Sequence, residues 1–258
     1  MSLSFCFLGA GNLATNLAKE LHEKAGKVVQ VYSRSEDSAS LLANHLNCSF
    51  TSKTEEIVPE ADIYFVALKD SAVPEVLSKI QLNNQLLVHC SGSLPLSVLS
   101  PYSENTGVFY PLQTFSKNRK VNFSEIPVFI ESDSTEIMQL LNEIALKISD
   151  KVSILDSVSR KSLHVAAVFA CNFVNHMYTL AADYLQANSI SFDVLHPLIK
   201  ETARKVQEMQ PLLAQTGPAV RFDKSVINSH LEMLSEFPEM KELYNSISKS
   251  IFDRHQTK

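Results

Sequence analysis

The feature that most constrains the fold of this chain is a glycine-rich turn near its N-terminus. Residues 9–14 read Gly-Ala-Gly-Asn-Leu-Ala, a G-x-G-x-x-A pattern between an apolar run and a helical pattern. Between a strand and a helix, such glycines allow a tight turn and close approach to a pyrophosphate, which the helix N-terminus attracts. A purely structural turn is the alternative. We favour a dinucleotide site formed by Gly9, Ala10, Gly11, Asn12 and Leu13.

Beyond the turn, short apolar runs alternate with helical patterns as far as about residue 155. Strands are predicted over 3–8, 27–32, 62–68, 85–90, 107–110, 127–131 and 152–155, and helices over 12–24, 35–46, 73–80 and 134–148. Near-continuous apolar strands separated by helices are typical of a parallel sheet covered on both faces. We therefore predict an α/β domain with a doubly wound parallel sheet over residues 1–152.

The pattern changes after Asp156. One helix is predicted over 157–188, and further helices over 191–208, 224–235 and 238–254, with prolines between them. No strand pattern recurs. The remainder, 153–258, is therefore predicted to be an all-helical domain.

Charge and cysteine usage exclude several classes of function. Of the 258 residues, 23 are Lys or Arg and 28 are Asp or Glu, and no basic run occurs. We expect neither a nucleic-acid partner nor a membrane partner. The four scattered cysteines form no C-x-x-C pair, so we expect buried thiols, no metal site and a reducing cytoplasm. We also find no signal peptide pattern and no apolar run long enough to span a bilayer.

The end of the second predicted strand indicates which dinucleotide binds. An NAD site would place Asp or Glu there to hold the ribose 2′-hydroxyl. This chain has Ser33, Arg34 and Ser35 instead, and a guanidinium suits a phosphate monoester. The sequence therefore favours NADP(H), although Arg34 as a solvated loop residue is the alternative and Glu36 opposes the assignment.

Two further strand ends are expected to face the same crevice, because ligands of open α/β sheets bind at the carboxyl ends of the strands. One end carries Leu68 and Lys69, and the other carries Ser91 and Gly92. We predict that these residues line the cofactor site. Lys69 as an ordinary loop charge is an equal alternative.

A polar stripe runs along the predicted long helix. At 100° per residue, Lys161, His164, Asn172 and Asn175 fall on one face of an otherwise apolar helix. Unpaired buried polar groups are costly, so this face is expected to line a cleft. We predict His164 and Asn172 as catalytic residues, with His164 as proton donor or polarising group. A hydrogen-bonded core histidine is the alternative.

Two weaker substrate candidates are Arg221 and Tyr110. Arg221 follows the Gly217-Pro218 turn, and a guanidinium group can bind a substrate carboxylate through two hydrogen bonds. A surface ion pair with Asp223 is the simpler interpretation of Arg221.

The quoted residues resemble the DUF2520 family of Rossmann-like NADP-dependent oxidoreductases. The resemblance extends over nearly the whole chain. It is carried by LGAGNLATNLA at 8–18, VYSRS at 31–35, DIYFVALKDSAV at 62–73, HCSGS at 89–93, YPLQTF at 110–115, HVAAVFACNF at 164–173 and TGPAVRFD at 216–223 with His230. The N-terminal segments are shared more loosely with pyrroline-5-carboxylate reductase and 6-phosphogluconate dehydrogenase.

The resemblance implies a C-terminal domain like that of 6-phosphogluconate dehydrogenase and a homodimer formed through the long helices. Two positions depart from the relatives. Tyr110 stands where relatives have His before Pro, and Asn175 stands near the position of the lysine of the β-hydroxyacid dehydrogenases. We therefore expect a reductase of a small carbonyl or imine. The alternatives are an NADP(H)-binding sensor without turnover and a reductase of a deazaflavin.

Overall fold

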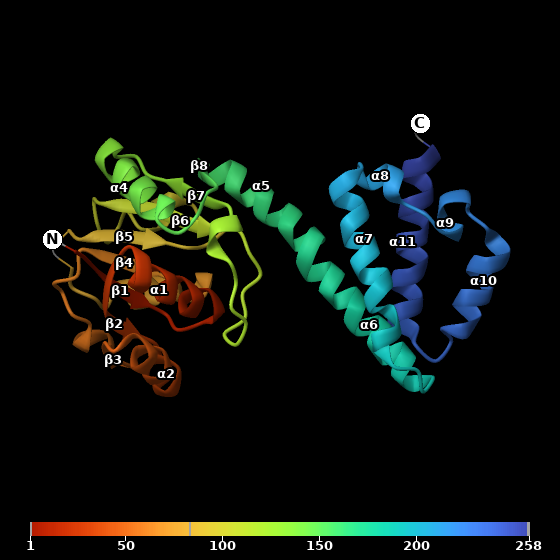
Figure 1. Ribbon diagram of the computed structural model, residues 1–258, viewed down its shortest axis with the longest axis horizontal. Helices are drawn as coiled ribbons and strands as arrows, with labels where there is room; N and C mark the ends of the chain where they lie inside the picture. The colour runs from red at the N-terminus through yellow and green to blue at the C-terminus, as the bar shows by residue number, and fades with distance from the viewer. Residues whose placement is uncertain (1, 83, 257–258) are drawn as a thin grey trace. The chain divides into compact units, whose positions relative to one another are not determined.

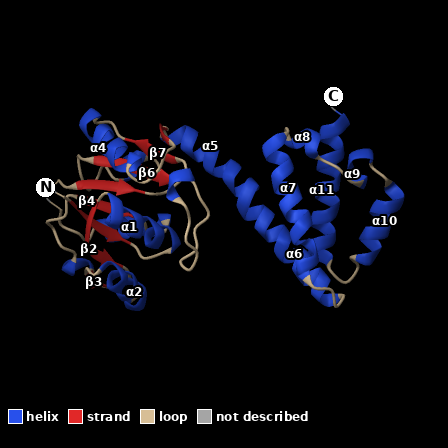
Figure 2. Ribbon diagram, viewed as in Figure 1, coloured by secondary structure: helices blue, strands red, loops and turns tan. Residues whose placement is uncertain are grey.

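A computed structural model describes residues 2–82 and 84–256 of the protein (Figures 1 and 2). The chain divides into two compact units, Met1–Cys171 and Asn172–Lys258. The predicted boundary lies earlier, between residues 152 and 153. The difference arises because the first turns of the helix that begins at Ser157 pack onto the sheet, through the buried side chain of Arg160.

The first unit contains one sheet whose described strands follow the order β3-β2-β1-β4-β5-β6-β7-β8. The strands are β1 (Leu3–Leu8), β2 (Gly26–Tyr32), β3 (Ser49–Thr51), β4 (Ile63–Val66), β5 (Leu86–His89), β6 (Thr106–Pro111), β7 (Val128–Glu131) and β8 (Val152–Ile154). All neighbouring pairs are parallel except β6 and β7. The first six positions have the order of a Rossmann sheet, with its reversal point between β1 and β4.

Helices of the first unit cover both faces of this sheet. They are α1 (Asn12–Lys24), α2 (Glu36–Leu46), α3 (Val73–Leu77), α4 (Thr135–Leu146) and α5 (Ser157–Ala167). Side chains of α1, α2 and α4 pack on one face, and side chains of α3 pack on the other. The prediction of a doubly wound α/β domain followed by an all-helical part is confirmed.

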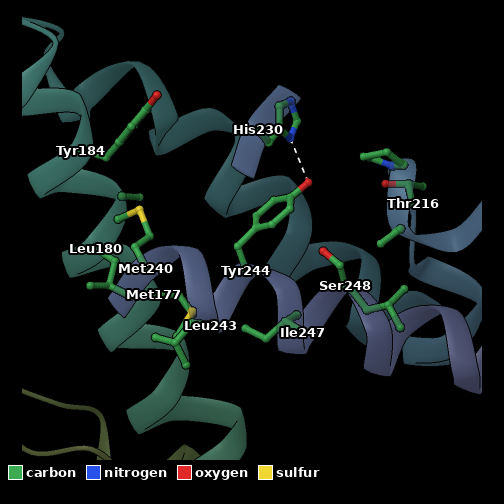
Figure 3. A pocket seen from close by; sticks show the side chains of 14 residues that line it. Met177, Leu180, Tyr184, Thr216, His230, Met240, Leu243, Tyr244, Ile247 and Ser248 are labelled. Carbon is green, nitrogen blue, oxygen red and sulfur yellow. Dashed lines mark hydrogen bonds between the residues drawn. The ribbon is translucent and has the colours of Figure 1, made fainter. Parts of the chain in front are cut away.

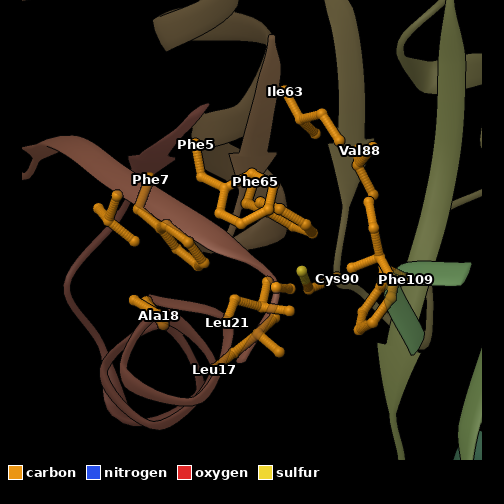
Figure 4. Packing of buried hydrophobic residues seen from close by; sticks show 14 of the residues in the cluster. Phe5, Phe7, Leu17, Ala18, Leu21, Ile63, Phe65, Val88, Cys90 and Phe109 are labelled. Carbon is orange, nitrogen blue, oxygen red and sulfur yellow. The ribbon is translucent and has the colours of Figure 1, made fainter. Parts of the chain in front are cut away.

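Alternation along the strands divides the core into two layers. Successive residues of a strand point to opposite faces, so Phe5 and Phe7 lie on the α1 side of β1 while Cys6 lies on the α3 side. On the α1 side, the rings of Phe7 and Phe65 stack with centroids 5.0 Å apart, beside Leu17 and Leu21 of α1 (Figure 4). Burial on both faces explains why these strands are nearly continuous apolar runs.

Two features of the sheet differ from the prediction. The strand β3 was not predicted, because Ser49, Phe50 and Thr51 do not form an apolar run. The strand β7 runs antiparallel to β6, although a parallel sheet was predicted. Between Pro111 and Val128 the chain, which is described throughout, forms only the short 3₁₀ turn Phe123–Glu125. Parallel neighbours are usually joined by a crossover helix. This segment is long enough for such a crossover but contains no α-helix, and β7 returns antiparallel beside β6.

The second unit consists of helices joined by loops and contains no strand among its described residues. Its helices are α6 (Val174–Ala187), α7 (His196–Glu208), α8 (Pro211–Ala214), α9 (Pro218–Arg221), α10 (Lys224–Met233) and α11 (Pro238–Gln256). Between α5 and α6 the residues Val168–Phe173 form a π-helical turn, so helical structure is continuous from Ser157 to Ala187.

The segment Ser157–Ala187 is long and apolar enough to cross a membrane by length and composition. One such helix is weak evidence for a membrane span, and its apolar window has no residue buried within the structure, unlike a core helix. The cysteines are all free. Cys6 and Cys90 are buried, and burial raises the pKa of the Cys6 thiol to about 12. Cys48 is only half-buried and Cys171 is exposed, so the prediction of four buried thiols is wrong for these two.

Candidate active site

The glycine turn lies at the carboxyl end of β1, next to the reversal point of the sheet. Gly9 has φ +123°, and a Cβ there would collide with the carbonyl oxygen of Ala67 after β4. The Gly9 amide donates to the carbonyl of Tyr32 at the end of β2, at 2.7 Å. Only glycine permits both the backbone conformation and the close approach. Gly9 therefore joins the ends of three adjacent strands.

Gly11 leaves open space at the start of α1. Apart from Gly11 and its two chain neighbours, no described residue has a heavy atom within 4 Å of a Cβ placed on Gly11, whose φ is an ordinary −77°. Gly11 precedes the first residue of α1, no side chain caps the helix there, and its first turn contains no acidic residue. The first amides of the helix and its partial positive charge are thus available to an anion, and these residues fit the pyrophosphate of a dinucleotide. Ala10 is buried beneath the turn, whereas Asn12 is exposed.

The Ser33–Ser35 loop after β2 is held by neighbouring backbone. The Ser33 amide donates to the carbonyl of Thr51 in β3, at 3.2 Å. The Ser35 hydroxyl caps α2 by accepting from the Ser38 amide at 3.3 Å. Arg34 between them is exposed and has no ion pair within the residues that the structure describes. A cation on an ordered loop fits a 2′-phosphate, although Glu36 begins α2 directly after it.

The predicted residues after β4 and β5 lie at the ends of two adjacent strands. Leu68 is half-buried and packs against the α3 side of the core, whereas Lys69 is exposed. The next residue, Asp70, accepts a hydrogen bond from the hydroxyl of Ser93, which links the two loops. Ser91 accepts hydrogen bonds from the amides of Ser93 and Leu94 at 3.1 and 3.2 Å.

Three predicted residues meet at the end of β5. A Cβ on Gly92 would lie 2.5 Å from Nδ1 of His164 and 2.9 Å from Cζ of Tyr110, so both rings rest against the backbone of Gly92. The Tyr110 hydroxyl and His164 Nδ1 are 2.9 Å apart and form a hydrogen bond. Tyr110 is only 6% exposed, and burial raises the pKa of its hydroxyl. The phenol is therefore kept protonated beside an imidazole, a pair suited to proton transfer.

The sequence prediction missed an ion pair with a buried guanidinium beside these rings. Arg160 is fully buried and pairs with the carboxylate of Glu131 at the end of β7. Its guanidinium also donates to the carbonyls of Ser91, at 3.2 Å, and Leu94, at 2.6 Å. In the sequence, Arg160 is only a charged residue four positions before His164, and Glu131 is only a charged residue at the end of an apolar run. Both residue types are usually found at the surface.

His89 is a second missed residue, at the last position of β5. It is fully buried, and Nδ1 accepts from the Ser91 amide at 3.2 Å. Among residues 2–82 and 84–256, Nε2 has no hydrogen-bond partner of normal geometry, although the Pro95 carbonyl is close enough to favour the charged ring. Burial outweighs that carbonyl and, together with the charge of Arg160, lowers the pKa of His89 to about 4.

The neutral state of His89 predicts a loss of stability in mild acid. In the unfolded chain a histidine titrates near 6.5, so between about pH 6.5 and 4 the unfolded state binds more protons than the folded state. The free energy of unfolding should fall as pH drops through this window. Urea unfolding at pH 7, 6 and 5 measures the slope, and His89→Phe should flatten it. Equal slopes for the two proteins would contradict the assignment.

The other predicted residues belong to the second unit. Asn172 lies in the π-helical turn and is exposed, and Arg221 is exposed at the end of α9. The stripe prediction assumed 100° per residue from Lys161 to Asn175. That assumption is wrong, because the turn Val168–Phe173 is π-helical and contains an extra residue relative to α-helix.

A largely apolar hollow of about 430 Å³ lies within the second unit, between α6 and α11 (Figure 3). Met177, Leu180 and Leu243 line it, and the Tyr244 hydroxyl and His230 Nδ1, 2.9 Å apart, form a hydrogen bond at its wall. No Asp, Glu, Lys or Arg is among its described lining residues.

Two family matches cover most of the chain. Residues 126–251 match DUF2520, which is described as a domain of unknown function. Residues 4–92 match the family described as NADP oxidoreductase, coenzyme F420-dependent. No match was found among the curated proteins.

Solved structures resemble the whole chain. A "putative NADP oxidoreductase" from Bacteroides fragilis is 50% identical, with a TM-score of 0.95 over 98% of each chain. A protein from Thermotoga maritima is 25% identical, with a TM-score of 0.71 over 98% of each chain. An imine reductase from Myxococcus stipitatus in complex with NADP⁺ is 14% identical, with a TM-score of 0.65 over 98% of this chain and 93% of that one. The last likeness concerns the fold alone.

Proposed function

Because this chain belongs to the DUF2520 family, we propose that it is an NADP(H)-dependent oxidoreductase that transfers a hydride between the nicotinamide and a small carbonyl or imine substrate. One observation carries the proposal. The open turn at Gly11 and the hydrogen-bonded pair of Tyr110 and His164 stand at the carboxyl ends of strands in the same sheet. This is the edge at which open α/β sheets bind their ligands.

NADP(H) is the cofactor, and the chain offers a group for each of its parts. The turn from Gly9 to Leu13 would hold the pyrophosphate, and Ser33, Arg34 and Ser35 would hold the 2′-phosphate. Leu68, Lys69, Ser91 and Gly92 would line the site toward the nicotinamide. The bound cofactor supplies or accepts the hydride, and the protein contributes position and electrostatics.

The protein must also move one proton. Reduction of a C=O or C=N bond adds a hydride to carbon and requires a proton on oxygen or nitrogen. When the Tyr110 hydroxyl donates to Nδ1, the His164 ring carries its hydrogen on Nε2, where it can polarise the substrate. A ring that carries hydrogens on both nitrogens can instead give the Nε2 proton to the substrate and is left neutral, with its Nδ1 hydrogen donated to the Tyr110 oxygen. Asn172 would hold the substrate, and Arg221 would bind a substrate carboxylate.

Nucleotide binding tests the proposal first. The sequence contains no Trp, so the fluorescence of bound NADPH and NADH can be followed with little protein background. NADPH should bind more tightly than NADH. Arg34→Ala should weaken NADPH binding by roughly 10- to 100-fold, the loss expected for a charged hydrogen bond, and leave NADH binding unchanged.

The control is Lys53→Ala, which removes an exposed lysine near β3 that already pairs with Glu56 at 2.8 Å. It should leave both affinities unchanged. If neither nucleotide binds to the wild type, the enzyme proposal fails. NADPH oxidation with a panel of aldehydes, ketones and cyclic imines then identifies the substrate class. Binding without turnover on any member, including a deazaflavin, would favour the sensor alternative.

Substitution of His164 tests the proton-transfer role. His164→Ala should lower turnover of the identified substrate by about 10²- to 10⁴-fold, the usual contribution of a general acid, with little change in NADPH affinity. Tyr110→Phe keeps the ring against Gly92 and removes only the hydroxyl, so it should lower turnover less. Unchanged turnover in His164→Ala would exclude the role.

The proposal includes a cytoplasmic homodimer formed through the long helices. Exposed apolar side chains on α5 support it, since Val158 is 77% and Val165 58% exposed. Light scattering after size exclusion should give twice the chain mass of 28.7 kDa, and Val165→Glu should shift the protein toward the monomer. A wild-type molar mass of one chain would contradict this part.

A further inference from the structure

We infer that Arg160 is a positioning residue that fixes the loop Ser91–Leu94 and the helix carrying His164 as one rigid support for the nicotinamide end of the cofactor. The inference rests on the proposed function, since that function supplies the cofactor. It concerns a residue whose side chain is fully buried and therefore cannot itself touch a ligand.

The first support is the direction of the guanidinium hydrogen bonds. Nε donates to the Ser91 carbonyl and Nη2 donates to the Leu94 carbonyl, so one side chain holds both ends of the loop that contains Gly92. Two bonds from one planar fork fix orientation as well as distance. The carbonyls on either side of Gly92 are thereby held toward the protein interior.

The second support is the geometry of α5. Arg160 and His164 are four residues apart, so they lie on the same face of the helix, one turn from each other. The same Gly92 backbone that Arg160 fixes through Ser91 supports the imidazole of His164. Any shift of Arg160 therefore moves the loop and the ring relative to each other.

The third support is the anchor of the guanidinium itself. Glu131 pairs with Arg160 and also accepts from the amide and the hydroxyl of Ser157, both at 2.9 Å. The Ser157 hydroxyl in turn accepts from the Leu96 amide at 2.9 Å. The first turn of α5, the end of β7 and the loop after β5 thus share one hydrogen-bonded network.

The charge of Arg160 also reaches the tyrosine of the proposed proton-transfer pair. Burial raises the pKa of Tyr110, and the positive charge of Arg160 partly opposes that rise. The other ionisable groups packed around this network are Glu131, His164 and His89, with Asp70 hydrogen-bonded to the same loop through Ser93. Loss of the charge should therefore move the Tyr110 titration upward.

Three variants separate geometry from charge. Arg160→Lys keeps the charge but loses the planar guanidinium, and Arg160→Met loses both. The double variant Arg160→Met/Glu131→Met removes the ion pair without leaving an unpaired carboxylate. Circular dichroism first establishes that each variant is folded. The surface control is Arg204→Met, which breaks an exposed pair with Glu208 on α7.

We expect Arg160→Lys and the double variant to bind NADPH about tenfold more weakly, because binding must then order a loop that is no longer held. Hydrogen exchange of the amides of residues 91–96 should accelerate in both. Absorbance titration at 295 nm, taken as the difference from the matching Tyr110→Phe protein, should show an upward shift in Arg160→Met and little shift in Arg160→Lys.

Folded Arg160→Lys and double variants that bind NADPH as the wild type does would overturn the inference. If Arg160→Met does not fold, the double variant and Arg160→Lys still decide the matter through affinity and exchange. Failure of the wild type to bind NADPH would instead refute the proposed function, so the two failures are distinguishable.

Discussion

Replacing Gly9 with alanine is expected to lower the free energy of unfolding by about 2–5 kcal/mol, the sum of backbone strain and overpacking. The backbone at Gly9 has φ +123°, which side-chain-bearing residues rarely adopt. The added Cβ would also press on the carbonyl of Ala67, which is backbone and cannot swing aside. Relief would require β1 and β4 to separate at the reversal point of the sheet.

Gly11→Ala is the matched control for Gly9→Ala. Its Cβ meets open space and its φ is ordinary, so the cost in unfolding free energy should be about 1 kcal/mol or less. The two variants should diverge in urea unfolding, while both bind NADPH more weakly. If the two variants were equally stable, the ends of β1 and β4 would have to move apart at little cost in free energy, which would contradict the packing described above.

The second large effect is expected from breaking the buried ion pair. Arg160→Met leaves the Glu131 carboxylate without its guanidinium, and such losses cost about 3–5 kcal/mol of stability. The double variant Arg160→Met/Glu131→Met should recover part of this loss, because no charge is then left uncompensated. Thermal and urea unfolding of the three proteins measure the difference.

An exposed ion pair provides the comparison. Lys79 and Glu75 on the α3 side are 3.2 Å apart, and both side chains are 56% exposed. Lys79→Met should cost at most about 1 kcal/mol, as surface pairs usually do. A loss in Arg160→Met no greater than in Lys79→Met would mean that water solvates the Glu131 carboxylate, whose side chain is 15% exposed, well enough to replace the guanidinium.

The sequence predicted the sheet well because its strands are buried on both faces and therefore read as apolar runs. The sequence also predicted the glycine turn, because a tight turn between a strand and a helix requires glycines at fixed spacing and few other sequences form it. The three-residue strand β3 gave no such signal. The direction of β7 relative to β6 depends on the segment that connects the two strands. The residues of β7 themselves do not specify that direction, so the sequence did not predict the antiparallel pair.

The proposed catalytic site was predictable only in part. The sequence identified His164 and Tyr110 as separate candidates, but it did not indicate that they form a hydrogen bond. The two rings can meet only because residue 92 is a glycine and has no side chain between them. Arg160 and Glu131 are ordinary surface residue types, and only the fold shows that they pair and that Arg160 is buried. Asn172 was predicted to share a helix face with His164 on the assumption of 100° per residue. The π-helical turn between the two residues interrupts that regular spacing.

The contact between Gly92 and the two rings has an evolutionary consequence. A side chain at position 92 and an imidazole at position 164 compete for the same volume, so the two positions are not free to drift independently. A lineage that acquires alanine at position 92 must first accept a smaller residue at 164 or a displaced ring. A histidine at position 164 should therefore be accompanied by glycine at position 92, and a side chain at position 92 should be found only where the histidine has been lost or its ring displaced.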